Sequence, residues 1–279
     1  MLGLQLIKIR DEEFYELAEI IRNQCGIIFR KNKQYLLEYK LTPRLRELGF
    51  NSFSDYINYL KYPILNKQEL KKLVNLITVN ETYFFREKNQ IEYMIKHAIP
   101  ELVSAQKKSF RIWSAGCSTG EEPYSITMLL KESSLLDKYN FEIIATDVST
   151  EVLEKAKGGV YKKASFRNSN DEKVLLKYFD VQNQNYYLKN NIKSLVKFLY
   201  FNLVNNDIIS YLGKMDYIFC RNVLIYLDVE AKKKVVELFY EILNDEGCLF
   251  LGYAETLYKI TDKFILKNFS GGSFYKKRL

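Results

Sequence analysis

The chain is poor in the residues that build several common kinds of site. His97 is the single histidine among 279 residues, so a histidine-based metal centre or a Ser-His-Asp triad is not expected. The four cysteines follow no zinc-ligand spacing, and we expect them to be reduced thiols because no export signal precedes them. No window holds 18 uninterrupted apolar residues, so no membrane span is predicted.

What the chain does contain is the composition of a folded globular protein. Hydrophobic residues make up 47% and charged residues 27%, and the length suits roughly two domains of about 150 residues. The net charge of +8 is compatible with nucleic acid, an anionic surface or an acidic protein as partner. Basic residues gather between Arg30 and Arg46, where Glu38 is the one acid, and such a run is most simply a solvated face.

Apolar residues at helical spacing predict four helices in the first 80 residues or so. Gly26 ends the first and Gly49 the second. Pro43 lies inside the second helix and is expected to kink or break it. The fourth helix is expected to begin at Asn66, with Glu69 three residues on as its capping partner.

From Phe110 onward the pattern alternates between strand and helix. The short apolar runs FRIWSAG, FEIIATD, FLYFNL, YIFCRN and CLFLGYAE are separated by helical stretches, which predicts an α/β fold with a parallel sheet covered on both faces. The end reads as a hairpin, FILKNF and FYKKRL around SGGS. The polar stretch between Tyr161 and Lys197 does not fit the alternation, and we expect a β-hairpin in YYLKNNIKSLVKFLYF.

Ligands of an open parallel sheet bind at the carboxyl ends of the strands, so the residues that follow each strand are candidates. Gly116 and Gly120 follow the first strand and allow a tight turn. Asp147 follows the second strand, where an acid would hold a ribose diol. A dinucleotide is not expected, because the third glycine is missing and Glu121 and Glu122 occupy the pyrophosphate position. A positively charged nucleotide cofactor, S-adenosylmethionine, fits better.

Each of these positions also has a purely structural interpretation. Thr119 with Glu122 makes a good capping box at a helix start. Asp147 could begin a turn with Ser149. Arg86 could pair with a neighbouring glutamate on a surface helix. The functional interpretation is favoured because several candidates fall at strand ends on one rim of the sheet.

Four segments, NETYFFRE, IWSAGCSTGEEPYSI, ATDVSTEVLEKAKGGVY and IFCRNVLIYLD, resemble the CheR-type chemotaxis receptor methyltransferase family. The resemblance implies a class I S-adenosylmethionine-dependent methyltransferase sheet with an inserted small β-subdomain, preceded by an all-helical domain. On that basis we expect a helical receptor-docking domain at 1–80 and a helical linker at 81–100 that contributes to the cofactor site. The methyltransferase domain would then span 101–279, with its insertion at about 161–197.

The resemblance also implies the roles of individual residues. Arg86 and Tyr226 are expected to be catalytic, with Tyr226 near the transferred methyl and Arg86 orienting either the acceptor or the cofactor. The expected cofactor contacts are Asn80, Thr82, Arg86, Ala115, Glu122, Asp147, Asn202, Leu203, Arg221 and Asn222. The basic run is expected to be the receptor-docking face, through Lys33, Lys40, Arg44 and Arg46.

The activity implied is methyl transfer from S-adenosylmethionine to glutamate side chains of chemoreceptor cytoplasmic helices, leaving S-adenosylhomocysteine. We expect a cytoplasmic monomer that binds no nucleic acid and does not insert into the membrane. Two alternatives stay open from the residues alone. One is a class I methyltransferase acting on a nucleic acid or small molecule, and the other is a regulatory protein that binds the cofactor without turnover.

Overall fold

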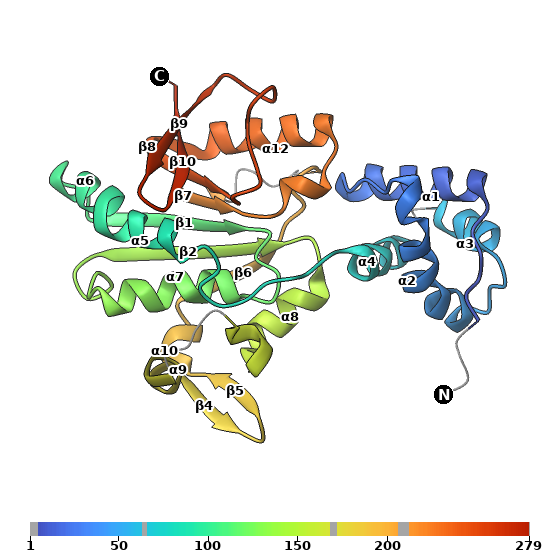
Figure 1. Cartoon of the computed structure of the whole chain (residues 1–279), viewed down its shortest axis with the longest axis horizontal. Coiled ribbons are helices and arrows are strands. Elements are labelled where there is room, and N and C mark those ends of the chain that lie inside the picture. Colours follow the sequence, from blue (N-terminus) through green and yellow to red (C-terminus); the bar gives the residue numbers. More distant parts are fainter. Residues whose placement is uncertain (1–4, 63–65, 168–171, 206–211, 279) are drawn as a thin grey trace. The chain divides into compact units, whose positions relative to one another are not determined.

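The computed structural model describes residues 5–62, 66–167, 172–205 and 212–278 (Figure 1). Residues 168–171 of the predicted insertion therefore lie outside the described part. The chain forms two compact units. The helical unit runs up to Val79 and includes Tyr226–Asp228, and the sheet unit comprises Asn80–Ile225 and Val229 onward. Within the described residues, no helix is long and apolar enough to cross a membrane.

The helical unit contains the four predicted helices. They are α1 (Asp11–Cys25), α2 (Gln34–Glu47), α3 (Phe53–Leu60) and α4 (Lys67–Ile77), with a 3₁₀ turn at Lys31–Lys33 before α2. Gly26 ends α1 in the left-handed conformation, at φ 73°. Helix α2 continues through Pro43, so the predicted break is absent. Leu41 and Leu45 on either side of Pro43 are fully buried, and their packing outweighs the hydrogen bond that proline cannot make.

The predicted capping pair at the start of α4 is wrong. The Asn66 side chain donates from Nδ2 to the Tyr59 carbonyl and caps nothing in α4. The Glu69 carboxylate accepts hydrogen bonds from Tyr56 Oη, at 2.8 Å, and from Arg44 Nε, at 3.1 Å. Glu69 is therefore a buried partner of α2 and α3, and tertiary contacts have replaced the local cap.

The sheet unit is built on a seven-stranded sheet. Its strands are β1 (Ser109–Ala115), β2 (Asn140–Asp147), β6 (Val196–Tyr200), β7 (Met215–Cys220), β8 (Leu243–Leu251), β9 (Phe264–Phe269) and β10 (Gly272–Lys277). The spatial order is β6-β2-β1-β7-β8-β10-β9, which is 3-2-1-4-5-7-6 when these strands are counted along the chain. β10 is antiparallel to both of its neighbours, which confirms the predicted terminal hairpin and an otherwise parallel sheet.

Helices connect the parallel strands, as the alternation predicted. The α-helices in the described part of the sheet unit are α5 (Lys88–Tyr93), α6 (Ile99–Ser104), α7 (Glu121–Glu132), α8 (Thr150–Gly158), α9 (Glu172–Tyr178), α10 (Asn190–Lys193) and α12 (Val229–Ile242). Right-handed crossovers put α7 and α8 on one face of the sheet and α12 on the other (Figure 1). The stretch expected to be helical from residue 81 becomes helical only at Lys88, because Phe85 and Glu87 have positive φ.

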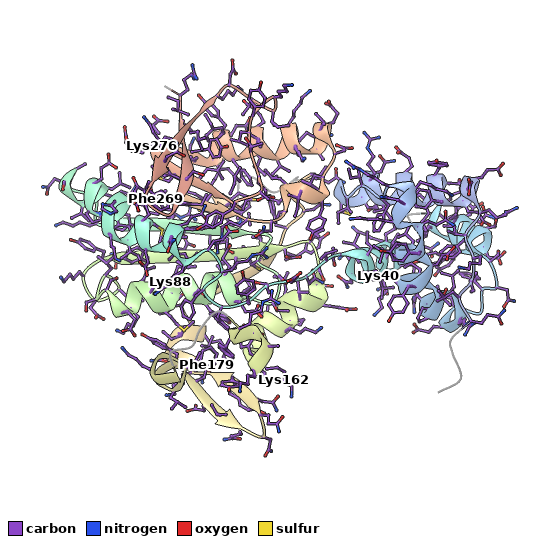
Figure 2. The ribbon with its side chains drawn as sticks, viewed as in Figure 1. Lys40, Lys88, Lys162, Phe179, Phe269 and Lys276 are labelled. Carbon is purple, nitrogen blue, oxygen red and sulfur yellow. The ribbon has the colours of Figure 1, made fainter. Side chains whose placement is uncertain are left out.

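A three-stranded antiparallel sheet of order β3-β5-β4 forms the inserted β-subdomain. Its strands are β3 (Val160–Lys162), β4 (Phe179–Gln182) and β5 (Asn185–Leu188). The hairpin was predicted in the wrong place: it joins β4 to β5, while residues 196–200 are strand β6 of the main sheet. The ring of Phe179 (Figure 2) lies 5.3 Å from that of Phe84, so the aromatic core of the subdomain extends to the segment that precedes α5.

Candidate functional site

The turn after β1 approaches the end of β2 closely. The backbone N–H groups of Gly116 and Cys117 donate to the Thr146 carbonyl, at 2.8 and 2.9 Å. Gly116 and Gly120 have φ values of 80° and 93°, a region in which side chains are strained. Gly120 directly precedes α7, so this turn brings a helix N-terminus to the carboxyl ends of the strands. The two-glycine turn was predicted from sequence and is confirmed.

Asp147 ends β2 and is almost completely buried, with 8% of its surface exposed. One carboxylate oxygen accepts from the Ser118 N–H and the other from the Ser149 N–H, both at 2.9 Å. Burial raises the pKa of the Asp147 carboxyl, and these backbone hydrogen bonds oppose that rise. The turn with Ser149, offered as the structural alternative, is present. It leaves acceptor positions on both oxygens, because a carboxylate has about four.

Glu122 links the first turn of α7 to two strand ends. One of its oxygens accepts from Ser114 Oγ and the other from Arg221 Nε, each at 2.6 Å. The capping box that was offered as the structural alternative is absent, because the Thr119 hydroxyl binds Glu121, also at 2.6 Å. The side chain of Arg221 is only 2% exposed, so this is an ion pair largely shielded from water.

The Glu121 carboxylate has different hydrogen-bond partners from the Glu122 carboxylate. It is buried, and it also accepts a hydrogen bond from Ser165 Oγ at 3.1 Å. Burial raises the pKa of the Glu121 carboxyl. Tyr161 Oη donates to the Thr119 carbonyl at 2.8 Å. Strand β3 is thus bonded directly to the turn after β1, and the 3₁₀ turn at Lys163–Phe166 is bonded to the first residue of α7.

The segment from Asn80 to Glu87 is held by the sheet unit through its backbone. The Asn80 carbonyl accepts from Ser118 Oγ at 3.0 Å, and the Arg86 carbonyl accepts from Arg221 Nη1 at 2.8 Å. Arg86 donates its Nη1 to the Glu81 carbonyl at 3.2 Å and stacks over Tyr83. The structural alternative for Arg86, a pair with the carboxylate of Glu81 or Glu87 on a surface helix, is therefore not what the structure shows.

Of the remaining predicted cofactor residues, Ala115, Asn202 and Leu203 lie at or just after strand ends, whereas Thr82 does not. Ala115 is buried as the last residue of β1, and Thr82 lies in the segment before α5. Asn202 and Leu203 follow β6, beside β2 in the sheet, and Asn202 Oδ1 accepts from the Val204 N–H at 3.0 Å.

Asn222 carries the strongest sign of an absent partner. Its Oδ1 is buried and has no hydrogen-bond partner among the described residues. Buried polar atoms are rarely left unpaired, so a ligand donor near Asn222 would complete this site. An acid after β2, a glycine turn after β1 and this amide oxygen suit a nucleoside cofactor.

Two side chains that the sequence did not single out also belong to this region. Glu87 is partly buried, and its Oε2 lies 3.8 Å from Arg221 Nη1. Glu255 follows β8 and accepts backbone hydrogen bonds from the loop after β7. Burial raises the pKa of both carboxyls. The sequence offered one signal for Glu255, its place at the end of a predicted strand.

Tyr226 belongs to the helical unit. Its carbonyl accepts from the Ile28 N–H at 3.0 Å, and its neighbour Leu227 forms a β-bridge with Ile27. Its predicted place near the transferred methyl stays a prediction. Cys117 is excluded as a nucleophile, because complete burial holds the pKa of its thiol well above the ordinary value.

Two of the four predicted docking residues are committed to the helical unit itself. Lys40 (Figure 2) is half-buried, and its Nζ donates to the carbonyls of Ile77 and Thr78, at 3.3 and 2.9 Å. Burial lowers the pKa of Lys40. Arg44 forms ion pairs with Glu69 and with Glu47. Lys40 therefore binds carbonyl groups at the C-terminal end of α4, and Arg44 pairs with the buried Glu69, so neither side chain extends freely into solvent.

Reversing the charge of Arg44 should therefore destabilise the fold. Arg44→Glu would face the buried Glu69 with a second carboxylate. We expect a loss of about 2 kcal/mol of unfolding free energy, less than for a fully buried pair because the Arg44 side chain is 17% exposed. Urea unfolding measures it. Lys33→Glu, at an exposed position in the same run, is the control and should change stability by less than about 0.5 kcal/mol. Equal stability of the two variants would contradict this.

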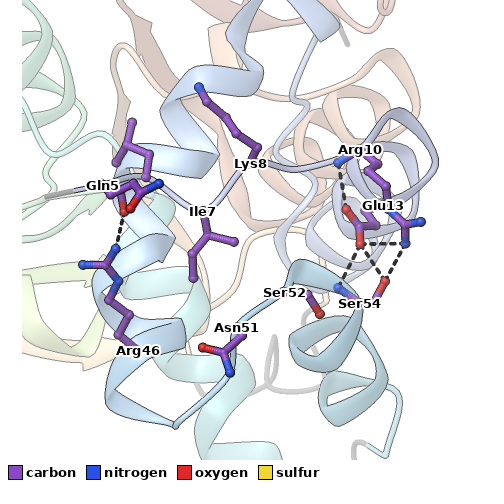
Figure 3. A pocket seen from close by; sticks show the side chains of 10 residues that line it. Gln5, Ile7, Lys8, Arg10, Glu13, Arg46, Asn51, Ser52 and Ser54 are labelled. Carbon is purple, nitrogen blue, oxygen red and sulfur yellow. Dashed lines mark hydrogen bonds and ion pairs between the residues drawn. The ribbon is translucent and has the colours of Figure 1, made fainter.

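A groove of about 560 Å³ lies on the helical unit, between the N-terminal arm and the start of α3 (Figure 3). Arg46 reaches into it and binds the Gln5 carbonyl. Glu13 is bonded by Arg10 and Ser54, and although burial opposes this, those bonds lower its pKa to about 2. Arg10, Glu13 and Ser54 thus bind one another, and Arg46 is bound to the backbone of the N-terminal arm. Of the four predicted docking cations, Lys33 is the one that is exposed and has no side-chain partner within the described part of the chain.

The strand order, the glycine turn after β1 and the buried acid after β2 define a class I methyltransferase that uses S-adenosylmethionine. Comparison with known families gives the particular one. Residues 12–78 match the model for the CheR methyltransferase all-alpha domain, and residues 80–271 match the model for the CheR methyltransferase SAM-binding domain. The chain belongs to the CheR methyltransferase family, which confirms the resemblance, the fold class, the cofactor and the enzyme class predicted from sequence.

Relatives match over nearly their whole length. "Chemotaxis protein methyltransferase 2" of Vibrio cholerae is 38% identical over 274 residues, covering 97% of this chain and 94% of the relative. "Chemotaxis protein methyltransferase" of Escherichia coli is 31% identical, covering 94% and 90%. A solved magnesium protoporphyrin IX methyltransferase from Synechocystis, with bound SAM, is 15% identical with a TM-score of 0.35, covering 67% of this chain and 77% of that one. This last likeness is too low to carry an argument.

Proposed function

We propose that this methyltransferase acts in chemotaxis by transferring the methyl group of S-adenosylmethionine to glutamate side chains of a chemoreceptor's cytoplasmic domain. The full-length likeness to relatives named chemotaxis protein methyltransferases supports the substrate class. The proposal includes a monomer acting in the cytoplasm, and light scattering of the purified protein tests the monomer.

The residues proposed to hold the cofactor are those at the strand ends. Asp147 would accept hydrogen bonds from the ribose hydroxyls, and Asn222 would present its Oδ1 to a ligand donor. Glu122 would contribute negative charge near the cofactor's cationic end. Its ion pair with Arg221 would partly neutralise that charge. The single observation that carries the proposal is the buried Asp147 carboxylate, which keeps open acceptor positions beside the turn after β1.

The proposed reaction needs no catalytic base. A glutamate carboxylate is ionised at pH 7, and it supplies the electron pair for the new C–O bond. The cofactor supplies an electrophilic methyl group whose C–S bond breaks with its electron pair moving to sulfur. No proton moves, so the protein's task is to bind, align and exclude water. The absence of a catalytic histidine or thiol among the site residues agrees with this chemistry.

Receptor docking is proposed for the exposed face of α2. Tyr35 and Tyr39 are 60% and 67% exposed and stand one turn apart on this helix, and Lys33 lies just before it. Aromatic side chains with a neighbouring cation suit an acidic helical partner. Of the four cations expected at this face, only Lys33 would contact the receptor. Tyr35 and Tyr39 would make the contacts that were expected of Lys40, Arg44 and Arg46.

The test is methyl transfer from labelled S-adenosylmethionine to purified receptor cytoplasmic fragments. Base-labile label on glutamate supports the proposal. Label on RNA, or cofactor binding without transfer to any fragment, would contradict it. Tyr39→Ala with Lys33→Glu should raise the KM for receptor while leaving cofactor affinity unchanged. The control is Lys61→Glu, a charge reversal on an exposed side chain that follows α3 and pairs with Glu16 of α1.

The β-subdomain is predicted not to capture a receptor tail peptide. Family members that bind such peptides resemble one another in a glycine-containing loop, and here residues 160–212 contain no glycine. A tight turn was expected to be difficult without glycine. The structure nevertheless has a two-residue turn, with Asn183 and Gln184 at φ 48° and 62°. The prediction now rests on the difference between this short, glycine-free loop and the glycine-containing loop of the peptide-binding members. Titration with receptor tail peptides tests the prediction, and micromolar binding would overturn it.

A further inference from the structure

The carboxylate of Glu255 lies where four backbone N–H groups converge. Its Oε2 accepts from Asn222 at 2.7 Å and from Gly252 at 2.9 Å. Its Oε1 accepts from Val223 at 3.0 Å and from Ile225 at 3.2 Å. Three of these four donors belong to the loop that follows β7, whereas Glu255 itself follows the next strand of the sheet, β8. One side chain therefore determines the path of a neighbouring strand's loop.

The carboxylate gives all four N–H groups a charged acceptor. Asn222 is left-handed, at φ 60°, and this turns successive N–H groups toward one point. Backbone concavities of this kind bind anions, and here the chain fills the concavity with its own glutamate. Hydrogen bonds to a charged acceptor are also stronger than neutral ones. The unusual conformation of Asn222 is thus stabilised by Glu255.

The loop held by Glu255 lies directly against the turn after β1. A Cβ atom on Gly116 would lie 2.4 Å from Val223 Cγ2, so the Val223 side chain fills the space that a side chain at position 116 would need. Gly116 in turn donates its N–H to the Thr146 carbonyl, next to Asp147. A shift of Val223 would therefore move the turn that also positions Ser118.

Asn222 is confined from its other side as well. A Cβ atom on Gly252 would lie 2.9 Å from Asn222 Nδ2 and 3.0 Å from Asn222 N. Gly252 and Glu255 thus fix both the backbone and the amide of Asn222, the residue whose buried Oδ1 has no partner among the described residues.

We propose that Glu255 is a positioning residue for the cofactor site: by binding the loop after β7, it places Asn222 and seats Val223 against the turn at Gly116. Glu255 acts through these residues and is not assigned a cofactor contact. The proposal rests on the cofactor site proposed above. If the wild-type protein fails to bind S-adenosylhomocysteine, that site is wrong. If the wild-type protein binds S-adenosylhomocysteine and the Glu255 variants bind it equally well, the positioning role is wrong and the cofactor site stands.

Calorimetric titration with S-adenosylhomocysteine tests the role in Glu255→Ala and Glu255→Gln. Glutamine has the shape of glutamate but only one acceptor oxygen. Its NH₂ group would face two of the four backbone N–H groups that glutamate binds. We expect Kd to rise about tenfold in Glu255→Ala, the factor that corresponds to about 1.4 kcal/mol, and by a smaller factor in Glu255→Gln. The KM for S-adenosylmethionine should rise more than kcat falls. If Glu255→Ala does not fold, the isosteric variant decides alone.

Asp216→Asn is the matched control. Asp216 is a buried carboxylate near the start of β7, bonded to Lys107 Nζ at 2.7 Å, the Arg111 N–H at 2.9 Å and Asn244 Nδ2 at 2.6 Å. Loss of the Asp216 charge should lower the melting temperature and leave the Kd for S-adenosylhomocysteine unchanged, because Asp216 and Asn222 lie at opposite ends of β7. A Kd within twofold of wild type in folded Glu255 variants overturns the proposal. So does an equal rise in Asp216→Asn, because affinity would then follow stability alone.

Discussion

Replacing Arg221 with alanine should lower the free energy of unfolding by about 3–5 kcal/mol and abolish measurable methyl transfer. The side chain is 2% exposed, and its Nε lies 2.6 Å from the Glu122 carboxylate. Alanine would leave that carboxylate in a site shielded from water without its ion-pair partner. Urea unfolding measures the loss of stability, and labelled methyl transfer measures the loss of activity.

The loss of activity has a second cause besides the unpaired Glu122, namely the loss of the bonds that hold the segment before α5. The conservative variant Arg221→Lys separates the two causes. Arg221 Nη1 donates to the carbonyls of Arg86, at 2.8 Å, and Glu87, at 3.2 Å, and so holds the segment before α5. A lysine has one ammonium group and cannot serve Glu122 and both carbonyls with the same geometry. Arg221→Lys should therefore recover part of the stability and little of the activity.

Removing both charges separates stability from function. Glu122→Gln with Arg221→Met removes both members of the 2.6 Å ion pair and leaves only the more distant Glu87, 3.8 Å from Arg221 Nη1, without its cation. It should therefore be more stable than Arg221→Ala. Methyl transfer should stay absent, since Glu122 and the fixed Arg86 segment are both lost. If Arg221→Ala unfolds at the wild-type urea concentration, the ion pair contributes nothing and this account of the site is wrong.

The sheet and its strand ends could be predicted because their signals are local. Runs such as FRIWSAG and FEIIATD are apolar over strand length, and the residues that follow them must lie at one edge of a parallel sheet. Asp147 and the glycine turn were found in this way. The terminal hairpin was found because SGGS separates two short runs.

The errors arose where a tertiary partner competes with a local signal. Thr119 with Glu122 has the spacing of a capping box, yet Glu122 binds Ser114 and Arg221 from two strands. Lys40 has the sequence context of a solvated cation, yet it binds the end of α4. No local pattern reveals these partners, because they lie eight to about a hundred residues away along the chain. Glu255 was missed for the same reason, since its acceptor role depends on a loop some 30 residues earlier.

Replacing Asp147 with asparagine should weaken binding of S-adenosylhomocysteine by about 10- to 150-fold, the range that corresponds to 1.5–3 kcal/mol for hydrogen bonds to a charged group. Both carboxylate oxygens already accept one backbone N–H, from Ser118 and Ser149. Their remaining acceptor positions would bind the ribose diol. Asparagine replaces one oxygen with a donor, so it loses a diol bond and also opposes one of the backbone N–H groups. Calorimetry measures the affinity, and a thermal melt without ligand reports any loss of fold.

The two effects of Asp147→Asn can be separated with a second ligand. An S-adenosylhomocysteine analogue that lacks both ribose hydroxyls should bind the wild-type protein more weakly than the parent compound, by about the same factor that the substitution costs. If Asp147 contacts the diol, the variant should distinguish the two ligands by a clearly smaller factor than the wild-type protein does, because asparagine keeps only one of the two carboxylate oxygens. If Asp147 only shapes the turn with Ser118 and Ser149, the variant should bind both ligands more weakly and still prefer the parent compound by the full wild-type factor. That second result would remove Asp147 from the cofactor site and leave it as a residue of the turn.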